Sequence, residues 1–300
     1  MDILTLSHVS KRFGSHKVID DLSFSVPENT IYGFIGENGA GKTTTMKMIL
    51  GLFPMENGVI EVNGEKVTYG QTNTNRYIGY LPDVPEFYGY MTPSEYLTLC
   101  GEITGIPEKQ LKNRILELLE LVGLDKANKR IQGFSRGMKQ RLGIAQALLN
   151  KPKLLICDEP TSALDPIGRK EIIDILQSVK NQTTVVFSTH ILSDVERICD
   201  EIGLLHNGKL ALQGNMNDIH KLRKRDGYEI EFYRMEDARI FSELFTGSEF
   251  ISKTQLLYKE RDEEDMLKAM KILYEHNLHP QKIEMREATL ESLFMEVVKK

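Results

Sequence analysis

The residues best suited to chemistry form a glycine-rich loop, residues 36–43, which reads Gly-Glu-Asn-Gly-Ala-Gly-Lys-Thr and matches the phosphate-loop pattern throughout. An apolar run precedes it and a helical pattern follows it, which is the context that the pattern requires. Glycines let backbone N–H groups turn toward phosphate oxygens, and the helix adds its positive dipole end. Lys42 would bind the β- and γ-phosphates of a nucleotide, and the Thr43 hydroxyl would ligate Mg²⁺. The expected phosphate-binding residues are Gly36, Asn38, Gly39, Ala40, Gly41, Lys42, Thr43 and Thr44.

A pair of carboxylates, Asp158 and Glu159, follows the apolar run at residues 154–157. A buried strand of this kind places its terminal acids at the carboxyl edge of a sheet, beside the phosphate loop. Asp158 would then belong to the Mg²⁺ shell, and Glu159 would polarise the attacking water as a general base. Two acids at a strand end would alone indicate a solvated loop, but downstream of a phosphate loop they predict nucleotide hydrolysis.

The elements that must position these residues alternate between strands and helices. Short strands and tight turns are predicted up to about residue 80, and a mainly helical segment follows over about residues 90–150. This segment opens with a predicted capping box at residues 92–95, and apolar residues recur at helical spacing over residues 108–122. Strand signals return at residues 154–157, 184–188 and 202–205, around a helix. This alternation predicts an α/β fold over residues 1–215, with a mostly parallel, buried sheet and an inserted helical subdomain.

The pattern changes after residue 213. Tyr228, Ile230 and Phe232 alternate with glutamates, which is typical of a half-buried strand, and two helical patterns with further strand signals follow. We expect a small α+β domain over residues 222–300, ending in an amphipathic helix at residues 288–300. It contains no recognisable catalytic constellation.

A second helix end could also bind phosphate. Ser135 is predicted to cap a helix, in the sequence Phe-Ser-Arg-Gly-Met at residues 134–138. In isolation this is only a helix cap. A single nucleotide in one subunit could not use it together with the loop at residues 36–43.

Together these segments resemble the nucleotide-binding subunit of an ABC transporter over roughly residues 1–215. Residues 134–138 are similar to the family's LSGGQ signature, and residues 162–165, Ser-Ala-Leu-Asp, to its D-loop. His190, in Ser-Thr-His, is similar to the switch histidine, and Phe13 stands where the family has an aromatic that stacks on adenine. Kinases and GTPases with phosphate loops lack the signature element.

The resemblance implies a P-loop NTPase core that binds ATP and Mg²⁺ and forms a head-to-tail dimer with a second cassette, identical or paralogous. Each ATP would lie between the Lys42 loop of one subunit and the partner's Ser135 and Gly137. Lys42, Glu159 and His190 would be catalytic, with His190 at the γ-phosphate, and Asp165 would communicate across the interface.

Three positions depart from the family pattern. Asp83 stands where the family usually has glutamine, although an acid could still ligate Mg²⁺ through water, which makes Thr43, Asp83 and Asp158 the expected metal-binding residues. Arg136 replaces a glycine of the signature and Met138 a glutamine. Since Ser135 and Gly137 remain, contact with the γ-phosphate is still feasible, and we interpret the chain as an active variant.

The predicted function is an energy-coupling ATPase that closes on ATP and drives a separate transmembrane permease. The tail at residues 288–294 resembles the end of a C-terminal domain found in many bacterial export-type cassettes, which favours an exporter. Two alternatives stay open, a soluble ABC protein of DNA repair or translation and a nucleotide-sensing regulatory module. Asp83 is the one feature that favours the module.

Bulk properties narrow the partners and the location. A net charge of −5 leaves no basic footprint for nucleic acid, and residues 221–225 are the one dense basic cluster, either a solvated junction or a contact with a partner or membrane surface. No apolar run approaches the ~20 residues that span a bilayer. Three scattered cysteines fit a reducing cytosol. We expect a cytoplasmic protein held at the inner face of the membrane by its permease.

Overall fold

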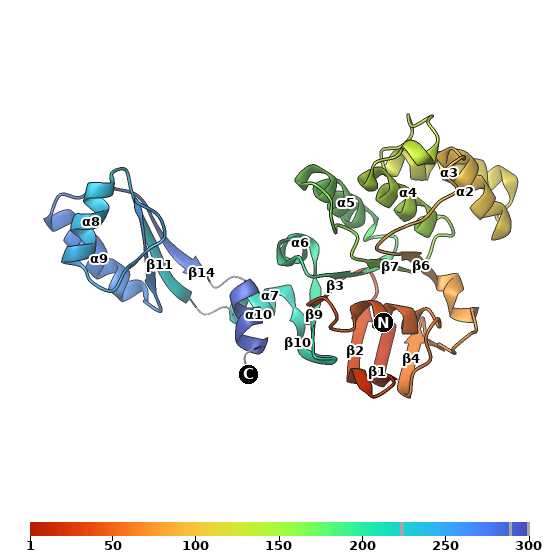
Figure 1. The fold of residues 1–300 in the computed structure, drawn as a ribbon, viewed down its shortest axis with the longest axis horizontal. Coiled ribbons are helices and arrows are strands. Elements are labelled where there is room, and N and C mark those ends of the chain that lie inside the picture. The colour runs from red at the N-terminus through yellow and green to blue at the C-terminus, as the bar shows by residue number, and fades with distance from the viewer. Residues whose placement is uncertain (223–224, 288–289, 299–300) are drawn as a thin grey trace. The chain divides into compact units, whose positions relative to one another are not determined.

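The computed structural model describes residues 1–222, 225–287 and 290–298. The chain divides into two compact units, Met1–Met216, here called the N-terminal unit, and Asn217–Lys300, the C-terminal unit (Figure 1). None of the helices in the described part of the chain combines the length and the apolar character that crossing a bilayer requires.

The N-terminal unit is built on a six-stranded sheet with the order β10-β9-β3-β8-β7-β6. Its strands are β3 (Ile31–Gly36), β6 (Ile78–Leu81), β7 (Leu154–Asp158), β8 (Thr184–Thr189), β9 (Glu201–His206) and β10 (Lys209–Asn215). All neighbours pair in parallel except β9 and β10, which are antiparallel. Every residue of β3, β7 and β8 is buried, because a parallel sheet is covered on both faces. The α/β fold predicted from the alternation is confirmed.

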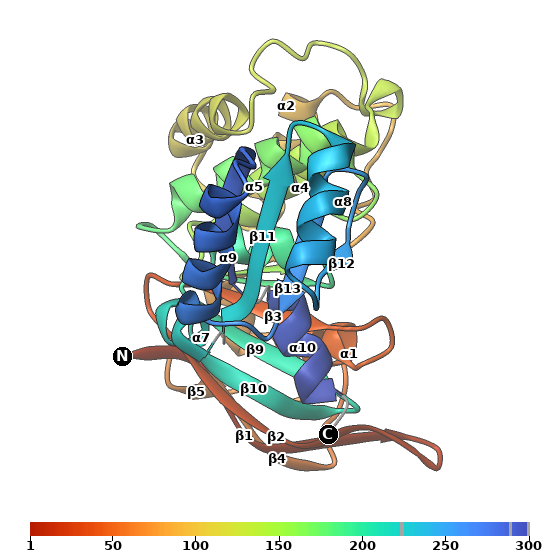
Figure 2. The ribbon, with the colours of Figure 1, turned by 90° about the vertical axis from the view of Figure 1, so that its left-hand side faces the viewer.

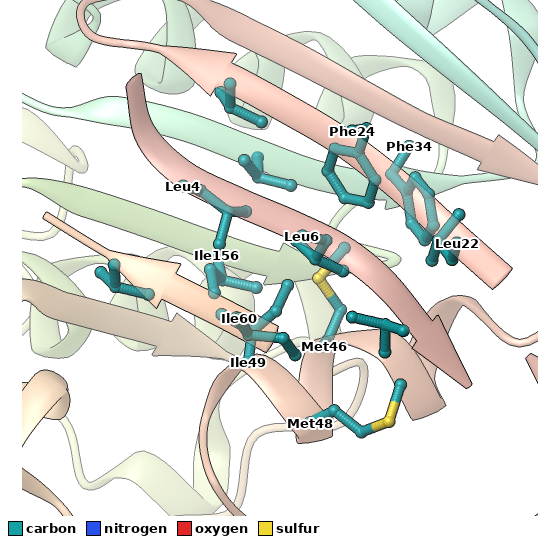
Figure 3. Close-up of a cluster of buried hydrophobic side chains, with 14 of the residues drawn as sticks. Leu4, Leu6, Leu22, Phe24, Phe34, Met46, Met48, Ile49, Ile60 and Ile156 are labelled. Carbon is teal, nitrogen blue, oxygen red and sulfur yellow. The ribbon is translucent and has the colours of Figure 1, made fainter. Parts of the chain in front are cut away.

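A second, antiparallel sheet has the order β2-β1-β4-β5. Its strands are β1 (Asp2–Phe13), β2 (His16–Pro27), β4 (Asn57–Val62) and β5 (Glu65–Lys66). Between the two sheets lies helix α1 (Lys42–Ile49), whose Met46, Met48 and Ile49 pack with Leu4 and Leu6 of β1 (Figure 3). The loop that joins β3 to α1 is therefore anchored by buried side chains at both of its ends.

The remaining helices of the N-terminal unit are α2 (Pro93–Ile103), α3 (Glu108–Leu121), α4 (Arg136–Leu148), α5 (Pro166–Val179) and α6 (Leu192–Ile198), with short 3-10 turns at Asn73–Tyr77 and Ile131–Gly133. Helices α4 and α6 contact the other side of the central sheet, α5 packs beside both of them, and α2 and α3 pack on α4 (Figure 1). The N-terminus of α2 carries the predicted capping box, in which Thr92 and Glu95 exchange side-chain to backbone hydrogen bonds. The apolar stripe predicted for α3 is buried, whereas α6 and β10 were not predicted from the sequence.

The C-terminal unit contains a four-stranded antiparallel sheet with the order β12-β13-β11-β14. Its elements are α7 (Met216–Leu222), β11 (Arg225–Phe232), α8 (Met235–Leu244), β12 (Glu249–Phe250), β13 (Gln255–Lys259), α9 (Glu263–Glu275), β14 (Pro280–Glu287) and α10 (Leu290–Val298). From β11 to β14 the succession β-α-β-β-α-β is that of a ferredoxin-like fold. Helices α8 and α9 cover one face of the sheet (Figures 1 and 2).

Two segments predicted from the sequence, the final helix and the basic cluster, include residues that the structure does not describe. The predicted final helix corresponds to α10, but residues 288, 289, 299 and 300 lie outside the described residues. The basic cluster at residues 221–225 includes residues 223 and 224, which also lie outside them, and the structure does not describe the side chains of its other members.

We predict that Phe241→Ala selectively loosens the C-terminal unit. Phe241 is fully buried, with its ring 5.6 Å from that of Phe232 and 5.9 Å from that of Phe245. Truncating such a ring costs about 3–5 kcal/mol of unfolding free energy. Hydrogen exchange should accelerate over residues 225–287 and stay unchanged in the N-terminal unit. Tyr274→Ala, at a side chain that is 88% exposed, is the control. Equal acceleration in both variants would contradict the packing described here.

Candidate functional site

The phosphate loop is shaped by glycines in conformations that other residues rarely adopt. Gly39 has a φ of 85° and Gly41 a φ of 112°. A Cβ at Gly41 would lie 2.5 Å from Ile19 Cδ1, so a side chain would also clash there. Gly41 precedes α1 and gives it no side-chain cap, and the first turn of the helix has no acidic residue. The first N–H groups of α1 are left for an anion, as in a phosphate cradle.

Lys42 supplies a buried positive charge at this loop. Lys42 is only 5% exposed to solvent. Its Nζ donates hydrogen bonds to the carbonyl oxygens of Gly36 at 2.7 Å and Glu37 at 3.2 Å. Glu159 Oε1 lies 3.1 Å from the same Nζ. A buried ammonium needs such counter-charges because desolvation penalises an unpaired ion. A phosphate would fit the donor set of this lysine and the loop N–H groups.

The two predicted carboxylates lie at the carboxyl end of β7 and are held by β8. Ser188 Oγ donates to Asp158 Oδ1 at 2.6 Å, and the Glu159 N–H points at both the Oγ and the carbonyl oxygen of Ser188, at 3.0 and 3.1 Å. Glu159 has a φ of 48°, the left-handed region that non-glycine residues seldom enter. This turn directs its carboxylate toward the phosphate loop. The sequence identifies Ser188 only as part of the histidine motif and does not predict this positioning role.

Glu159 also contacts His190, which follows β8. His190 Nδ1 lies 2.9 Å from Glu159 Oε2. Glu159 Oε1 is buried and, despite its proximity to Lys42, makes no hydrogen bond within the described residues. The structure thus brings together Lys42, Glu159 and His190, which the sequence placed far apart. A carboxylate oxygen has more than one acceptor position, so Oε1 could accept a hydrogen bond from water in addition to its contact with Lys42.

A cavity of about 290 Å³ opens beside this cluster and is lined by Lys42, Thr43, Asp83 and Glu159, among others. Hydroxyl and carboxylate oxygens are the ligands that Mg²⁺ prefers, with one or two carboxylates usually completed by phosphate oxygens. Thr43 and Asp83 line the cavity, and Asp158, which is buried, directly precedes the lining residue Glu159. No group of three or more acids, histidines or cysteines among the described residues forms a metal cage by itself. The donor set therefore fits a cation that arrives with a phosphorylated ligand.

The remaining predicted site residues do not line this cavity. Ser135 caps α4 by accepting a hydrogen bond from the Met138 N–H at 3.3 Å, and Gly137 lies in the first turn of α4. Asp165 caps α5 by accepting a hydrogen bond from the Gly168 N–H at 3.1 Å.

Phe13 is 46% exposed at the end of β1. Its ring lies edge-on to Phe53 at 5.6 Å, and Lys11 Nζ lies 5.0 Å from the ring centroid. A half-exposed aromatic ring in this environment has surface left for stacking with a planar base.

Asp83 makes contacts that the sequence did not predict. Its Oδ1 lies 3.3 Å from Arg136 Nη2, and its carbonyl oxygen accepts a hydrogen bond from Gln140 Nε2 at 2.6 Å. Two residues of α4 therefore hold the segment that follows β6. Nearby on β6, burial raises the pKa of Tyr80 to about 12, with Asp158 adding to the effect, so this phenol stays neutral.

ATP-binding proteins of ABC transporters are similar to this chain in sequence and in fold. Residues 19–162 match the family model described as ABC transporter. YxlF of Bacillus subtilis (strain 168), an uncharacterized ABC transporter ATP-binding protein, is 42% identical over 229 residues, 76% of each chain. The bacitracin transport ATP-binding protein BcrA of Bacillus licheniformis is 39% identical over 303 residues, covering 99% of this chain and 97% of its own. The solved ATP binding subunit of an ABC transporter is 33% identical, with a TM-score of 0.66, over 73% of this chain and 92% of its own.

We predict that Ser188→Ala destabilises the N-terminal unit by about 1–3 kcal/mol, because Asp158 would keep a buried carboxylate oxygen without its donor. Scanning calorimetry of the full chain should show a lowered unfolding transition for this unit. Ser178→Ala is the control, since Ser178 Oγ donates only to the Ile175 carbonyl of its own helix. An equally small effect from both substitutions would mean that Ser188 does not support the site.

Proposed function

The chain belongs to the family of ABC transporter ATP-binding subunits, and from that membership we propose that two cassettes close around ATP and thereby drive a separate membrane permease. The protein binds ATP, and its hydrolysis of ATP is coupled to transport. The observation that carries the proposal is the position of Glu159, within 3.1 Å of Lys42 and 2.9 Å of His190 at the mouth of the phosphate loop. A general base must lie within hydrogen-bond reach of the reacting water, beside the phosphate it attacks.

In this proposal the residues of the site have four roles. Lys42 and the loop N–H groups bind the β- and γ-phosphates, together with the side chains of Thr43 and Thr44. Thr43, Asp158 and Asp83 would hold Mg²⁺, which would neutralise charge on the phosphate oxygens. Glu159 accepts the proton of the attacking water, and His190 orients Glu159 and contacts the γ-phosphate. Phe13 stacks on the base.

The signature segment supports a dimer. Ser135 and Gly137 lie at the N-terminus of α4 and outside the cavity of their own chain. A helix N-terminus offers N–H donors and a positive dipole end to an anion. A second cassette, identical or paralogous, would use these groups on its own ATP, and Asp165 would lie at the same interface.

The proposed direction of transport is export. BcrA, whose name assigns it to bacitracin transport, is similar to this chain along nearly its entire length, C-terminal unit included. We therefore propose that the cassette works at the inner face of the cell membrane, held there by a permease encoded as another polypeptide.

Glu159→Gln should preserve ATP binding and trap a closed dimer, because the amide cannot take the proton from water. We expect ATP hydrolysis to fall by about 10²–10⁴-fold. Loss of the carboxylate also releases Lys42 from its ion pair, so affinity for ATP should not decrease. Light scattering with ATP should detect the dimer, and Glu102→Gln, at an exposed acid on α2, is the matched control. Hydrolysis by Glu159→Gln at the parent rate would contradict the assignment of the base.

The membrane partner can be tested by isolating the tagged chain from detergent-solubilised cells. We expect a protein with several membrane-spanning helices to co-purify, since no described helix of this chain can span a bilayer. Ribosomes or DNA in its place would instead support the soluble class of ABC proteins.

A further inference from the structure

Two oppositely charged residues that are distant in the sequence meet in the structure. Asp83 follows β6, Arg136 lies 53 residues further along the chain, and their side chains approach to 3.3 Å. Gln140, one turn after Arg136 on the same face of α4, donates to the carbonyl oxygen of Asp83 at 2.6 Å. The start of α4 thus holds both the backbone and the side chain at Asp83.

These two contacts differ in strength. Gln140 is fully buried, so its hydrogen bond fixes the backbone of Asp83 firmly. The side chains of Arg136 and Asp83 are 44% and 47% exposed. An ion pair this exposed contributes at most a few-fold to an equilibrium and exchanges easily. The loop is therefore fixed in place while the guanidinium can change partner.

Asp83 lies between two hollows of the N-terminal unit. It lines the cavity of about 290 Å³ that contains Lys42, Thr43 and Glu159. It also lines a neighbouring hollow of about 450 Å³, together with Arg136 and Lys139. One residue therefore borders both the phosphate cavity of its own chain and the start of α4, the segment assigned above to the partner's ATP.

We propose that Arg136 is a further phosphate-binding residue, acting on the nucleotide held by the partner chain, and that Asp83 is a positioning residue that holds its guanidinium until the two chains close. This inference rests on the proposed function, in which two cassettes form a dimer around ATP. Arg136 is the first residue of α4, between the cap residue Ser135 and Gly137, so its fork of donors leaves the same helix end as theirs. A triphosphate offers more negative charge and more acceptors than the single carboxylate of Asp83.

The arrangement also gives Asp83 two competing uses. While it pairs with Arg136, its carboxylate is not free to serve the Mg²⁺ shell of its own chain. Release of Arg136 to the partner's nucleotide frees Asp83 for that shell, so closing of the dimer and completion of the metal site favour each other. A glycine and a glutamine at these positions would remove both the attraction and the competition.

The test uses the full chain in the Glu159→Gln background and measures, by light scattering, the ATP concentration that gives half-maximal dimerisation. Arg136→Ala should raise this concentration about tenfold, the size expected for a charge-assisted hydrogen bond. Arg136→Lys should have an intermediate effect, because it keeps the charge without the planar fork. Asp83→Asn should lower the concentration by about two- to threefold, because it releases Arg136 while its amide oxygen can still serve the Mg²⁺ shell.

Two controls isolate the effect. Lys139→Ala removes the same charge from α4 three residues later and should leave the threshold unchanged. Binding of a fluorescent ATP analogue at protein concentrations too low for dimerisation should be the same for Arg136→Ala and its parent. In the double variant, Asp83→Asn should have no further effect, since it acts through Arg136.

The outcomes separate this inference from the function on which it rests. If the Glu159→Gln parent stays monomeric with ATP, both the proposed ATP-bound dimer and this inference are wrong. If the parent dimerises but Arg136→Ala does so at an unchanged ATP concentration, only the inference is overturned. It is also overturned if Asp83→Asn lowers the threshold equally with and without Arg136.

Discussion

The site depends on one buried charge, the ammonium of Lys42. Water is nearly excluded from this group, so the surrounding chain must supply its counter-charges. Two loop carbonyls and the Glu159 carboxylate do so at 2.7 to 3.2 Å. These partners define the space that a phosphate would take. Because the pairing uses the same carboxylate that we assign as the general base, phosphate binding and base release are linked through a single ion pair.

The parallel sheet meets this constraint by ending three strands at one edge. The register pairs Ile35 of β3 with Thr189 of β8, and Asp158 of β7 with Ser188 of β8. The loop lysine, the carboxylates and the histidine thus leave adjacent strands at the same level. The apolar packing of α1 between the two sheets fixes the loop at the point where the loop enters this helix (Figure 3). The site is therefore held in place by strand pairing and by burial of the core.

The sequence predicted what is encoded locally. The phosphate loop, the apolar strand before Asp158 and the capping box of α2 each lie within a few neighbouring residues, and their residue types define the backbone they need. Contacts between distant segments were not readable in this way. Asp83 and Arg136 are 53 residues apart, and neither the hydrogen bonds of Ser188 nor the strand order of the C-terminal unit follows from a periodic pattern. Helix α6 has only seven residues, too few for its period to stand out.

The left-handed backbone of Glu159 sets stability against turnover at one position. A side chain with φ near 48° costs of order 1–3 kcal/mol. Glycine would adopt this turn freely, so the substitution that best relaxes the strand end would also delete the carboxylate. Selection for heat resistance alone would therefore favour glycine at this residue and yield a cassette that does not hydrolyse ATP. Any such screen needs a parallel selection for catalysis.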